Sequence, residues 1–414
     1  MFLLTFLLLG IMTTAVMAAD LEISGELSQG LIYNFDEEQL SAADTNYKLE
    51  LAKELGFDGK LYLSFKGNYD LLNQTGDINL DEAYTSIYLD TTDLTIGRQV
   101  INWGTADGIN PTNSINPKSM DSFTNGELNG EPVLSAQATY YGNNFNLTGV
   151  VIPDFVPQDI SSFSSMGGGE EYSDLFANLD LTNDEPENKL ENMEYALKAE
   201  TRAAGYDLKF SYFHGWEDVP ALKMRLNSEG NPVINPETGQ PVLFAQYRKV
   251  DKLGLATAGT LNNVGVWAEA AYVIPEKLKV DSAAGEVSMS MNEPYLQAVI
   301  GSDYTFDNGI YAEGQYLYYG NGSLIIPYNL NPGEEVEAGQ YLMSRFSYDF
   351  DQDNTVELTS IINLDDQSGL VIPAYTHRLT QVTDLKVSPI LTIGEDGELS
   401  NLPQQLNVSI KTSF

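Results

Sequence analysis

Cysteine is absent from the 414 residues of this chain. Disulfides are therefore excluded, and a chain of this length must be held by an extended hydrogen-bonded framework or by a large core. The only two histidines, His214 and His377, stand at no recognisable motif spacing from a Ser or an Asp, and GxSxG, HExxH and P-loop motifs are absent. We predict that the protein is not an enzyme and binds no cofactor or metal, although catalytic groups need only meet in space.

Basic residues are scarce: 21 Lys and Arg stand against 59 Asp and Glu, which gives a net charge of −38. A nucleic-acid partner is excluded, because its phosphates require basic patches. Long hydrophobic runs are missing after residue 20. This excludes a helical membrane protein, since a spanning helix needs a run of about 18 or more apolar residues.

The chain begins with one uncharged apolar run, MFLLTFLLLGIMTTAVMAAD. Val16 and Ala18 fit the last positions before a cleavage site, so we predict a signal peptide over 1–18 and a mature chain over 19–414. The run is atypical in that no Lys or Arg precedes it. The alternative is a retained membrane helix, which is disfavoured because the run is short for spanning and stops at small residues.

Apolar and polar residues alternate with a period of two along most of the chain, which indicates half-buried strands. Over 193–202 one face carries Met193, Tyr195, Leu197, Ala199 and Thr201, and the other carries Glu194, Lys198, Glu200 and Arg202. The last residues, QQLNVSIKTSF, repeat the pattern. Each run has about 10 residues, the length that a tilted strand needs to cross a bilayer.

Short and long connections alternate between these runs. The short ones are LGFDG, DTTD, YGNN, AAGYD, TLNN, FDNG, FDQDN and LTQVTD, rich in residues that favour tight turns. The long ones lie near 36–45, 70–78, 103–131, 154–191, 217–242, 276–292, 321–337, 364–368 and 395–403. This layout predicts an all-β fold, a transmembrane antiparallel up-and-down β-barrel of about 18 strands (16 to 18), with short periplasmic turns and long outer loops. An antiparallel sandwich or a secreted β-helix is the alternative, and neither needs this regular alternation.

The connection over 103–131 follows the predicted fifth strand, Leu94 to Ile101, and contains two Asn-Pro pairs. Pro111 and Pro117 fix φ and bias the residue before them toward extended backbone, so this loop can be ordered without regular structure. We predict that it folds into the lumen as a constriction; the alternative is a surface loop that caps the barrel. The side chains it would offer a solute are Asp107, Asn110, Asn113, Asn116, Lys118 and Asp121.

Charged residues on predicted strands should face the lumen, because a Lys or Arg toward lipid at mid-depth costs about 2–4 kcal/mol. Glu82 and Arg98, on adjacent predicted strands, should therefore point inward or lie near a rim. The other lumen candidates are Lys198, Glu200, Arg202, Lys209, Glu269, Glu313, Arg345, Glu357, Lys386 and Lys411. The alternative for each is an ion pair that ties neighbouring strands, and Arg345 and Glu357 flank one turn in a way that would allow this.

Within 80–120, the stretch from LDEAYTSIYLD through LTIGRQVINWG to INPTNSINP resembles porin-like barrels of Gram-negative bacteria. These carry EAY, GRQ, WG and repeated NP, and the group includes uncharacterised and alginate-export-like proteins. The resemblance implies a bacterial outer-membrane location and contact with outer-membrane lipid. In general porins the third loop commonly narrows the lumen, and trimers are common, so a homo-oligomer is left open. The terminal Phe414 resembles the aromatic end that the barrel-assembly machinery reads.

The loop over 154–191 is strongly acidic and should raise the cation concentration at the mouth. A solvated surface or divalent bridging to lipid headgroups would explain it equally. We predict a porin-like channel for passive diffusion of small hydrophilic solutes, with a preference for cations. One alternative is a substrate-specific barrel for an oligosaccharide or a hydrophobic compound, lined by Tyr295, Tyr311, Tyr319, Tyr341 and Tyr375. The other is a non-conducting structural or adhesive barrel that displays its acidic loops.

Overall fold

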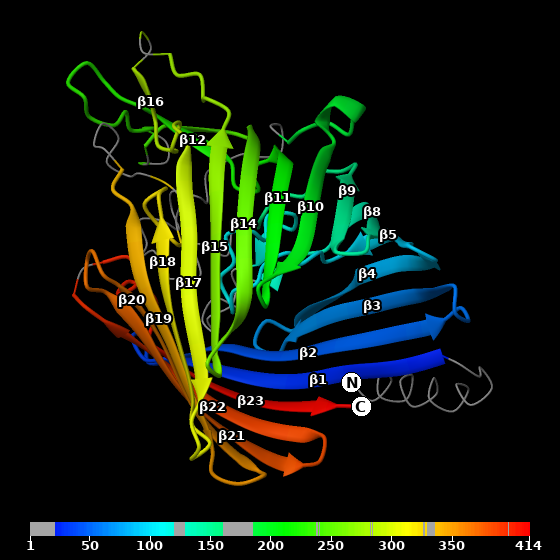
Figure 1. The fold of residues 1–414 in the computed structure, drawn as a ribbon. Helices are drawn as coiled ribbons and strands as arrows, with labels where there is room; N and C mark the ends of the chain where they lie inside the picture. The colour runs from blue at the N-terminus through cyan, green and yellow to red at the C-terminus, as the bar shows by residue number, and fades with distance from the viewer. Residues whose placement is uncertain are drawn as a thin grey trace.

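The structure is a computed structural model that describes residues 21–119, 129–159, 185–236, 239, 241–281, 283, 285–325, 328, 336–395 and 397–414. Eighteen strands pair in one antiparallel sheet, and the first strand pairs with the last, so the sheet closes into a barrel (Figure 1). The predicted all-β fold and the predicted number of strands are confirmed. The predicted signal peptide, Asp121 and most of 154–191 lie outside the described residues. Within the described ranges, no helix is long and apolar enough to cross a membrane.

The barrel strands follow one another round the wall in chain order. They are β1 (Leu21–Asn34), β2 (Gln39–Glu54), β3 (Gly59–Asp70), β4 (Thr75–Leu89), β5 (Thr92–Gln99), β8 (Val133–Tyr141), β9 (Phe145–Ile152), β10 (Glu194–Ala203), β11 (Tyr206–Trp216), β14 (Lys249–Leu261), β15 (Val264–Pro275), β17 (Tyr295–Thr305), β18 (Tyr311–Tyr319), β19 (Gly339–Asp349), β20 (Asn354–Asn363), β21 (Gly369–Thr380), β22 (Thr383–Ile393) and β23 (Gln405–Ser413). The short strands of the connections are β6 (Lys118–Ser119), β7 (Asn129–Gly130), β12 (Ala221–Arg225), β13 (Leu243–Gln246) and β16 (Glu286–Ser288), and a single 3₁₀ turn, η3, spans Leu190–Asn192.

The short turns lie where the sequence predicts them, but two predicted long loops are tight turns. Between β1 and β2, Asn34 Oδ1 accepts hydrogen bonds from the backbone N–H groups of Asp36 and Glu37, at 2.8 and 3.1 Å. Between β3 and β4, Asp70 closes the turn in the same way. The prediction of loops over 36–45 and 70–78 is wrong because a side-chain oxygen replaces the missing backbone partners and shortens each loop.

The alternation of the sequence separates the two faces of the wall. Tyr195 and Leu197 are 43% and 58% exposed, whereas Ala196 between them is fully buried. The exposed apolar face points outward, as expected of a surface that meets lipid, and the other face points into the barrel. The sequence therefore predicts correctly which side of β10 faces the interior.

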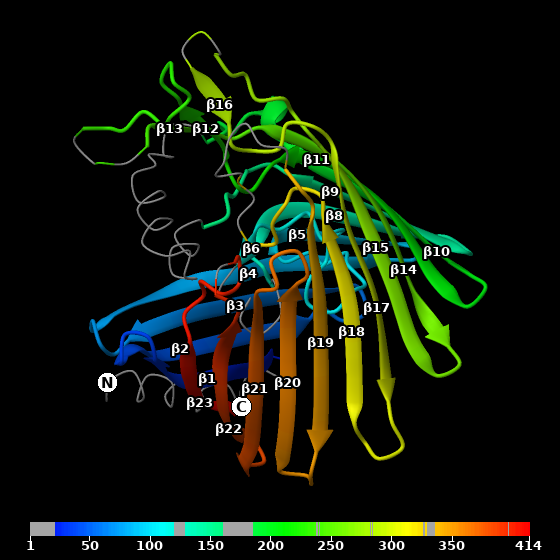
Figure 2. The same cartoon turned by 90° about the vertical axis from the view of Figure 1, so that its left-hand side faces the viewer.

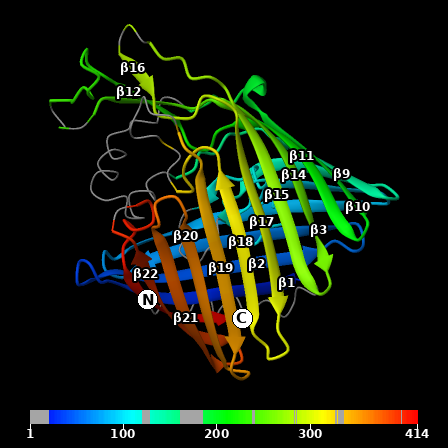
Figure 3. The same ribbon diagram turned by 60° about the vertical axis from the view of Figure 1, so that its left-hand side comes forward.

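The outer connections cover the mouth of the barrel. β12 pairs with β13 and with β16, and Figures 2 and 3 show this small sheet at the end of the barrel opposite the short turns that join β14 to β15 and β17 to β18. Beneath the sheet, Leu222, Met224 and Met289 belong to one apolar cluster with inward residues of β15 to β22. The outer end of the barrel thus has a packed core of its own.

Candidate pore constriction

The described residues of the connection between β5 and β8, 100–119 and 129–132, cross the inside of the barrel. The far contact of this connection is Glu269 of β15, which lies six strands further round the wall than β5. Glu269 Oε1 accepts hydrogen bonds from Thr105 Oγ1 and the Ala106 N–H, both at 2.7 Å, and from the Thr105 N–H. Glu269 Oε2 accepts from Thr112 Oγ1 at 2.7 Å and from the Thr112 N–H at 3.3 Å.

These hydrogen bonds from Thr105, Ala106 and Thr112, which we call the Glu269 clamp, compensate for the burial of the Glu269 carboxylate. Glu269 is 2% exposed, and a buried carboxylate is tolerated when hydrogen-bond donors surround it. Further along the wall, Gln315 Nε2 of β18 donates to the backbone carbonyl of Asp107 at 2.8 Å. A solute cannot reach Glu269, so the prediction that this residue faces an open lumen is wrong, because the loop covers it.

The second Asn-Pro pair holds the two ends of the loop together. The buried Asn116 accepts from the Ile101 N–H at 2.8 Å and donates to the carbonyl of Glu131 at 2.6 Å. It is therefore a structural residue, and the prediction that a solute contacts Asn116 is wrong. Asn113 is also buried. When its amide oxygen is turned toward Lys118, that oxygen accepts a hydrogen bond from Lys118 Nζ at 3.3 Å.

Apolar residues of the same loop pack on the inner wall. Ile101, Trp103 and Ile115 form a buried cluster with residues of β8 to β15, including Val133 and Val273. These contacts explain how a loop rich in Gly, Asn and Pro stays ordered inside a barrel, since its apolar side is covered and many of its polar groups are paired, although Asn110 Oδ1 is buried without a partner among the described residues.

Two predicted lumen lysines support the base of the loop. Lys198 Nζ lies 5.2 Å from the centre of the Trp103 ring and 3.2 Å from the Glu200 carboxylate. Lys209 Nζ donates to the carbonyl of Gly104 at 3.4 Å. Arg202 is remote from them, near the tight turn after β10, with its side chain 74% exposed. The structure thus brings together Lys198, Glu200 and Lys209 but not Arg202.

Acidic residues gather where β18 meets the tip of the loop. Asp107 is exposed, and Asp303 and Glu313 are directly paired on the adjoining inner wall. The carboxyl of Asp107 is nevertheless partly shielded from water, and this desolvation together with the negative Asp303 raises its pKa, while the positive Arg345 opposes them. Arg345 Nη2 lies 3.0 Å from Glu357 Oε2, so the cross-strand ion pair considered from the sequence is present.

Arg98 lies at the end of β5, where the loop begins, and Glu82 lies midway along the neighbouring β4. Glu82 Oε1 accepts from the Val100 N–H, and Arg98 Nε donates to the carbonyl of Asp81, both at 2.9 Å. Arg98 pairs with Leu134, which is 47% exposed, so it lies on the outward face at the end of its strand. The sequence allows Arg98 either to point inward or to lie near a rim, and the structure places it near a rim.

A polar wall over β1 to β4 and β23 was predicted from the sequence only at Lys411, and its other charged residues were missed. Ion pairs join Lys48 to Glu50 at 2.7 Å, Lys66 to Asp81 at 3.0 Å and Lys411 to Glu26 at 2.5 Å. The Lys66 and Lys411 side chains are each 52% exposed, unlike the buried Glu269 and Glu313 of β15 and β18. The sequence feature that could have predicted this wall is the placement of charged residues at alternating positions in KLELAK and SFKGNYD. Lys386 of β22 is half-buried, with no contact to this set among the residues described.

A cavity of about 200 Å³ lies between the loop and the outer connections. Lys118, Asp218, Lys252, Tyr295 and Tyr319 are among its lining residues. Burial lowers the pKa of Lys118 to about 8, against the opposing effect of Asp218. Burial likewise raises the pKa of Asp218 to about 6.

The inward tyrosines predicted from the sequence are partly confirmed. Tyr311, Tyr319 and Tyr341 lie on the inner face of β18 and β19, in register with Glu313 and Arg345. Tyr375 is 42% exposed on the outer face of β21, so its predicted inward position is wrong. It pairs with Val356, whereas the inward Glu357 pairs with Ala374.

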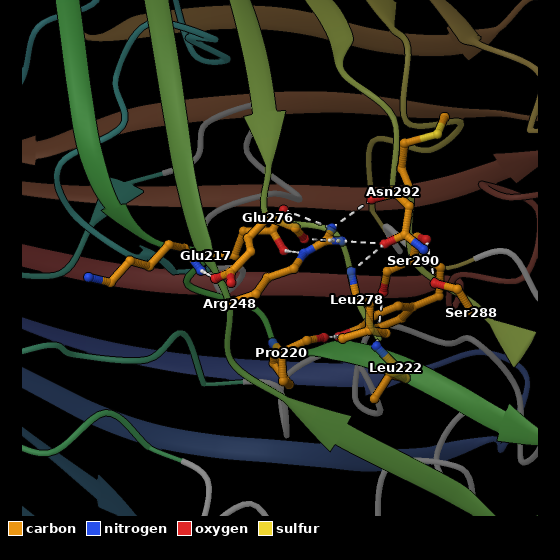
Figure 4. A network of polar contacts seen from close by, with 12 residues as sticks. Glu217, Pro220, Leu222, Arg248, Glu276, Leu278, Ser288, Ser290 and Asn292 are labelled. Atoms are coloured by element: carbon orange, nitrogen blue, oxygen red, sulfur yellow. Dashed lines mark hydrogen bonds and ion pairs between the residues drawn. The ribbon is translucent and has the colours of Figure 1, made fainter. Parts of the chain in front are cut away.

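Arg248 joins two outer connections above this cavity (Figure 4). Its guanidinium forms an ion pair with Glu217, at 2.5 Å for Nε, and Nη2 donates to the carbonyl of Met291 at 2.7 Å. Nη1 donates to Asn292 at 3.0 Å and to the carbonyl of Glu276 at 3.3 Å. The clasp is buried and fixes the connections before β14 and β17 to each other.

Among the described residues, no group of three His, Asp or Glu is placed to hold a metal ion.

No family model and no curated protein matches the sequence, so the group suggested by the EAY, GRQ, WG and NP pattern stays a prediction. Solved structures do match. OccAB4 of Acinetobacter baumannii aligns with a TM-score of 0.56 and 8% identity over 96% of this chain and 98% of that chain. The outer membrane protein OpdK of Pseudomonas aeruginosa gives 0.55 and 7% over 95% and 99%. OccD3 (OpdP) of the same organism gives 0.54 and 8% over 95% and 91%. The chain shares the closed antiparallel β-barrel fold of these proteins.

Proposed function

We propose that this protein is a bacterial outer-membrane channel through which small hydrophilic solutes diffuse passively, and that residues 100–132 set its bore. The observation that carries the proposal is the clamp between Glu269 and the loop residues Thr105 and Thr112. It holds a largely polar segment across the interior, far from the strands at which the loop begins and ends. A segment fixed there narrows any aqueous path.

The polar wall over β1 to β4 and β23 supports an aqueous path beside the loop. Its charged side chains are paired yet exposed toward the interior, as expected of a surface that stays wet. Many inward side chains of β15 to β21, such as Glu269, Leu317 and Ile361, are instead covered by the loop and by the outer apolar cluster. Solutes would therefore pass along one side of the barrel.

We further propose a preference for cations. The net charge of −38 and the exposed carboxylate of Asp107 on the inner loop favour positive ions. The predicted signal peptide over 1–18, lipid contact at the outward apolar face, reading of Phe414 by the assembly machinery and assembly into a homo-oligomer belong to the same proposal.

Liposome swelling with sugars of increasing size tests the bore. The mature protein should admit small sugars up to a sharp size limit, and deletion of 105–127 should raise that limit, because the segment that crosses the interior is removed. The deletion variant must show the heat-dependent gel mobility of a folded barrel. An unchanged size limit in a folded variant would contradict the proposed role of the loop.

A substrate-specific channel is the second candidate, and the cavity above the loop favours it. Tyr319 is 7% exposed, lines this cavity, and its hydroxyl has no hydrogen-bond partner among the described residues. Saturable uptake of one solute would support this candidate, whereas rates that scale with concentration support diffusion. A non-conducting barrel would give no swelling from folded protein.

A further inference from the structure

Two prolines face each other in the barrel wall between β21 and β22. The register pairs Val371 with Leu391 above this level and Tyr375 with Val387 below it. Continuing that register places Pro373 opposite Pro389. No residue of 372–374 is paired with 388–390, although both segments are strand throughout. We call this interruption, residues 372–374 and 388–390, the β21–β22 seam.

The missing pairs follow from the chemistry of proline. On their other sides, Pro373 pairs with Leu358 and Pro389 with Leu406 in unbroken ladders. The backbone groups of both prolines therefore turn toward the seam, where two N–H···O bonds would normally close a hydrogen-bonded pair. Neither proline has an N–H, so both bonds are lost and both carbonyls lack a donor in the opposite strand. Proline is normally confined to edge strands for this reason.

The inner face of the seam is largely apolar, with the buried Ser388 as its polar residue. Ile372 and Ile390 are 5% and 2% exposed and belong to the buried cluster that includes Leu399 and Leu402 of the last outer connection. The interior of a transmembrane barrel is usually polar, as it is over β1 to β4. Here apolar side chains stand on both faces of a wall that lacks two hydrogen bonds.

We propose that the β21–β22 seam is a lateral passage through which a single apolar chain moves between the barrel interior and the surrounding lipid. Separating the strands at this level breaks no backbone hydrogen bond between Pro373 and Pro389. A chain that enters meets Ile372 and Ile390 first and displaces the packing of Leu399. This route is independent of the aqueous path along β1 to β4, so the two proposals can fail separately.

A phosphatidylcholine with a photoreactive diazirine in its acyl chain tests the passage. The refolded protein is placed in vesicles of this lipid and illuminated, and the labelled residues are located by mass spectrometry. Outward residues such as Tyr375 should be labelled in every sample and serve as the internal standard. If the seam admits an acyl chain, the inward residues Ile372 and Ile390 are labelled as well.

Two variants then close the seam in different ways. Ala374→Cys with Ser388→Cys places a disulfide across it, and P373V with P389V returns both N–H groups. Each should reduce inward labelling at least fivefold, and reduction of the disulfide should restore it. The control is Thr139→Cys with Thr148→Cys, an inward pair in the unbroken β8–β9 ladder whose hydroxyls lie 3.1 Å apart. The chain has no cysteine of its own, so no other disulfide can form.

Labelling confined to outward residues in the unaltered protein would overturn the proposal. Inward labelling that persists in both closed variants would overturn it equally, because the label would then arrive by another route. Heat-dependent gel mobility shows that each variant is folded. Single-channel conductance should stay unchanged in the closed variants, which separates this passage from the aqueous channel.

Discussion

Glu269 is the residue on which the position of the inner loop depends most directly. Five donor contacts from Thr105, Ala106 and Thr112 converge on its carboxylate. The sequence marks Glu269 as inward through its alternation with apolar neighbours. It cannot show the loop as the partner, because the contacting residues lie more than 150 positions apart.

Glu269→Gln should loosen the loop. An amide has one acceptor oxygen instead of two and adds two donors beside the existing ones, which leaves buried groups unpaired at a cost of about 1–3 kcal/mol. Single-channel recordings should show larger or noisier conductance steps, and the thermal midpoint should fall.

Glu200→Gln is the matched control, because Glu200 is partly exposed and, within the described part of the chain, its ion-pair partner is Lys198. It should leave the conductance steps unaltered. Equal step amplitudes in Glu269→Gln and the unaltered protein would show that Glu269 does not hold the loop in place.

The cavity above the loop predicts a pH-dependent ion preference. As pH rises through about 6, Asp218 gains a negative charge, and through about 8, Lys118 loses its positive charge. Both changes make the cavity more negative, so cation preference should increase between pH 5 and pH 9. Reversal potentials in a KCl gradient measure this change.

The two steps can be assigned by substitution. Lys118→Met should remove the upper step, and Asp218→Asn should remove the lower one. A reversal potential that is constant from pH 5 to pH 9 would show that the permeating ions do not sense the cavity.

At the scale of elements, strands and tight turns were the most predictable features. Period two reports which side of a strand is buried, and this signal lies within each run, as in β10. The loops predicted over 36–45 and 70–78 failed because Asn34 and Asp70 close short turns through their side chains. The position of Arg98 could not be decided from the sequence, because short-range alternation does not locate the rim. The inward position predicted for Tyr375 was wrong, because alternation does not fix every register.

The last strand carries a prediction of its own. Phe414 continues the ladder beyond β23: its N–H and its carbonyl each bond with Gly25, both at 3.0 Å. Removal of Phe414 should lower the amount of barrel assembled in cells, because both a closing contact and the proposed assembly signal are lost.

Phe414→Tyr is the control, since it keeps the backbone contacts and an aromatic ring. Heat-dependent gel mobility of outer-membrane fractions measures the assembled barrel. Normal assembly without Phe414 would argue against an assembly signal at this residue.

At the scale of the whole molecule, the interior is divided into a covered side and a polar side. The inner loop, the outer apolar cluster and the Arg248 clasp occupy the side of β8 to β22. Alternation predicts the closed barrel but not this division, because loops decide which inward residues are covered. The predicted lumen candidates Glu269 and Asn116 are buried for that reason, while Lys48 and Lys66 of the polar wall were passed over.

Single-channel recording of the refolded mature protein tests the central claim most directly. With a tenfold KCl gradient across a planar bilayer, we expect steady ohmic steps, a cation-selective reversal potential, and larger steps after deletion of 105–127. Absence of conductance from protein shown to be folded would contradict the account of an aqueous channel narrowed by its inner loop.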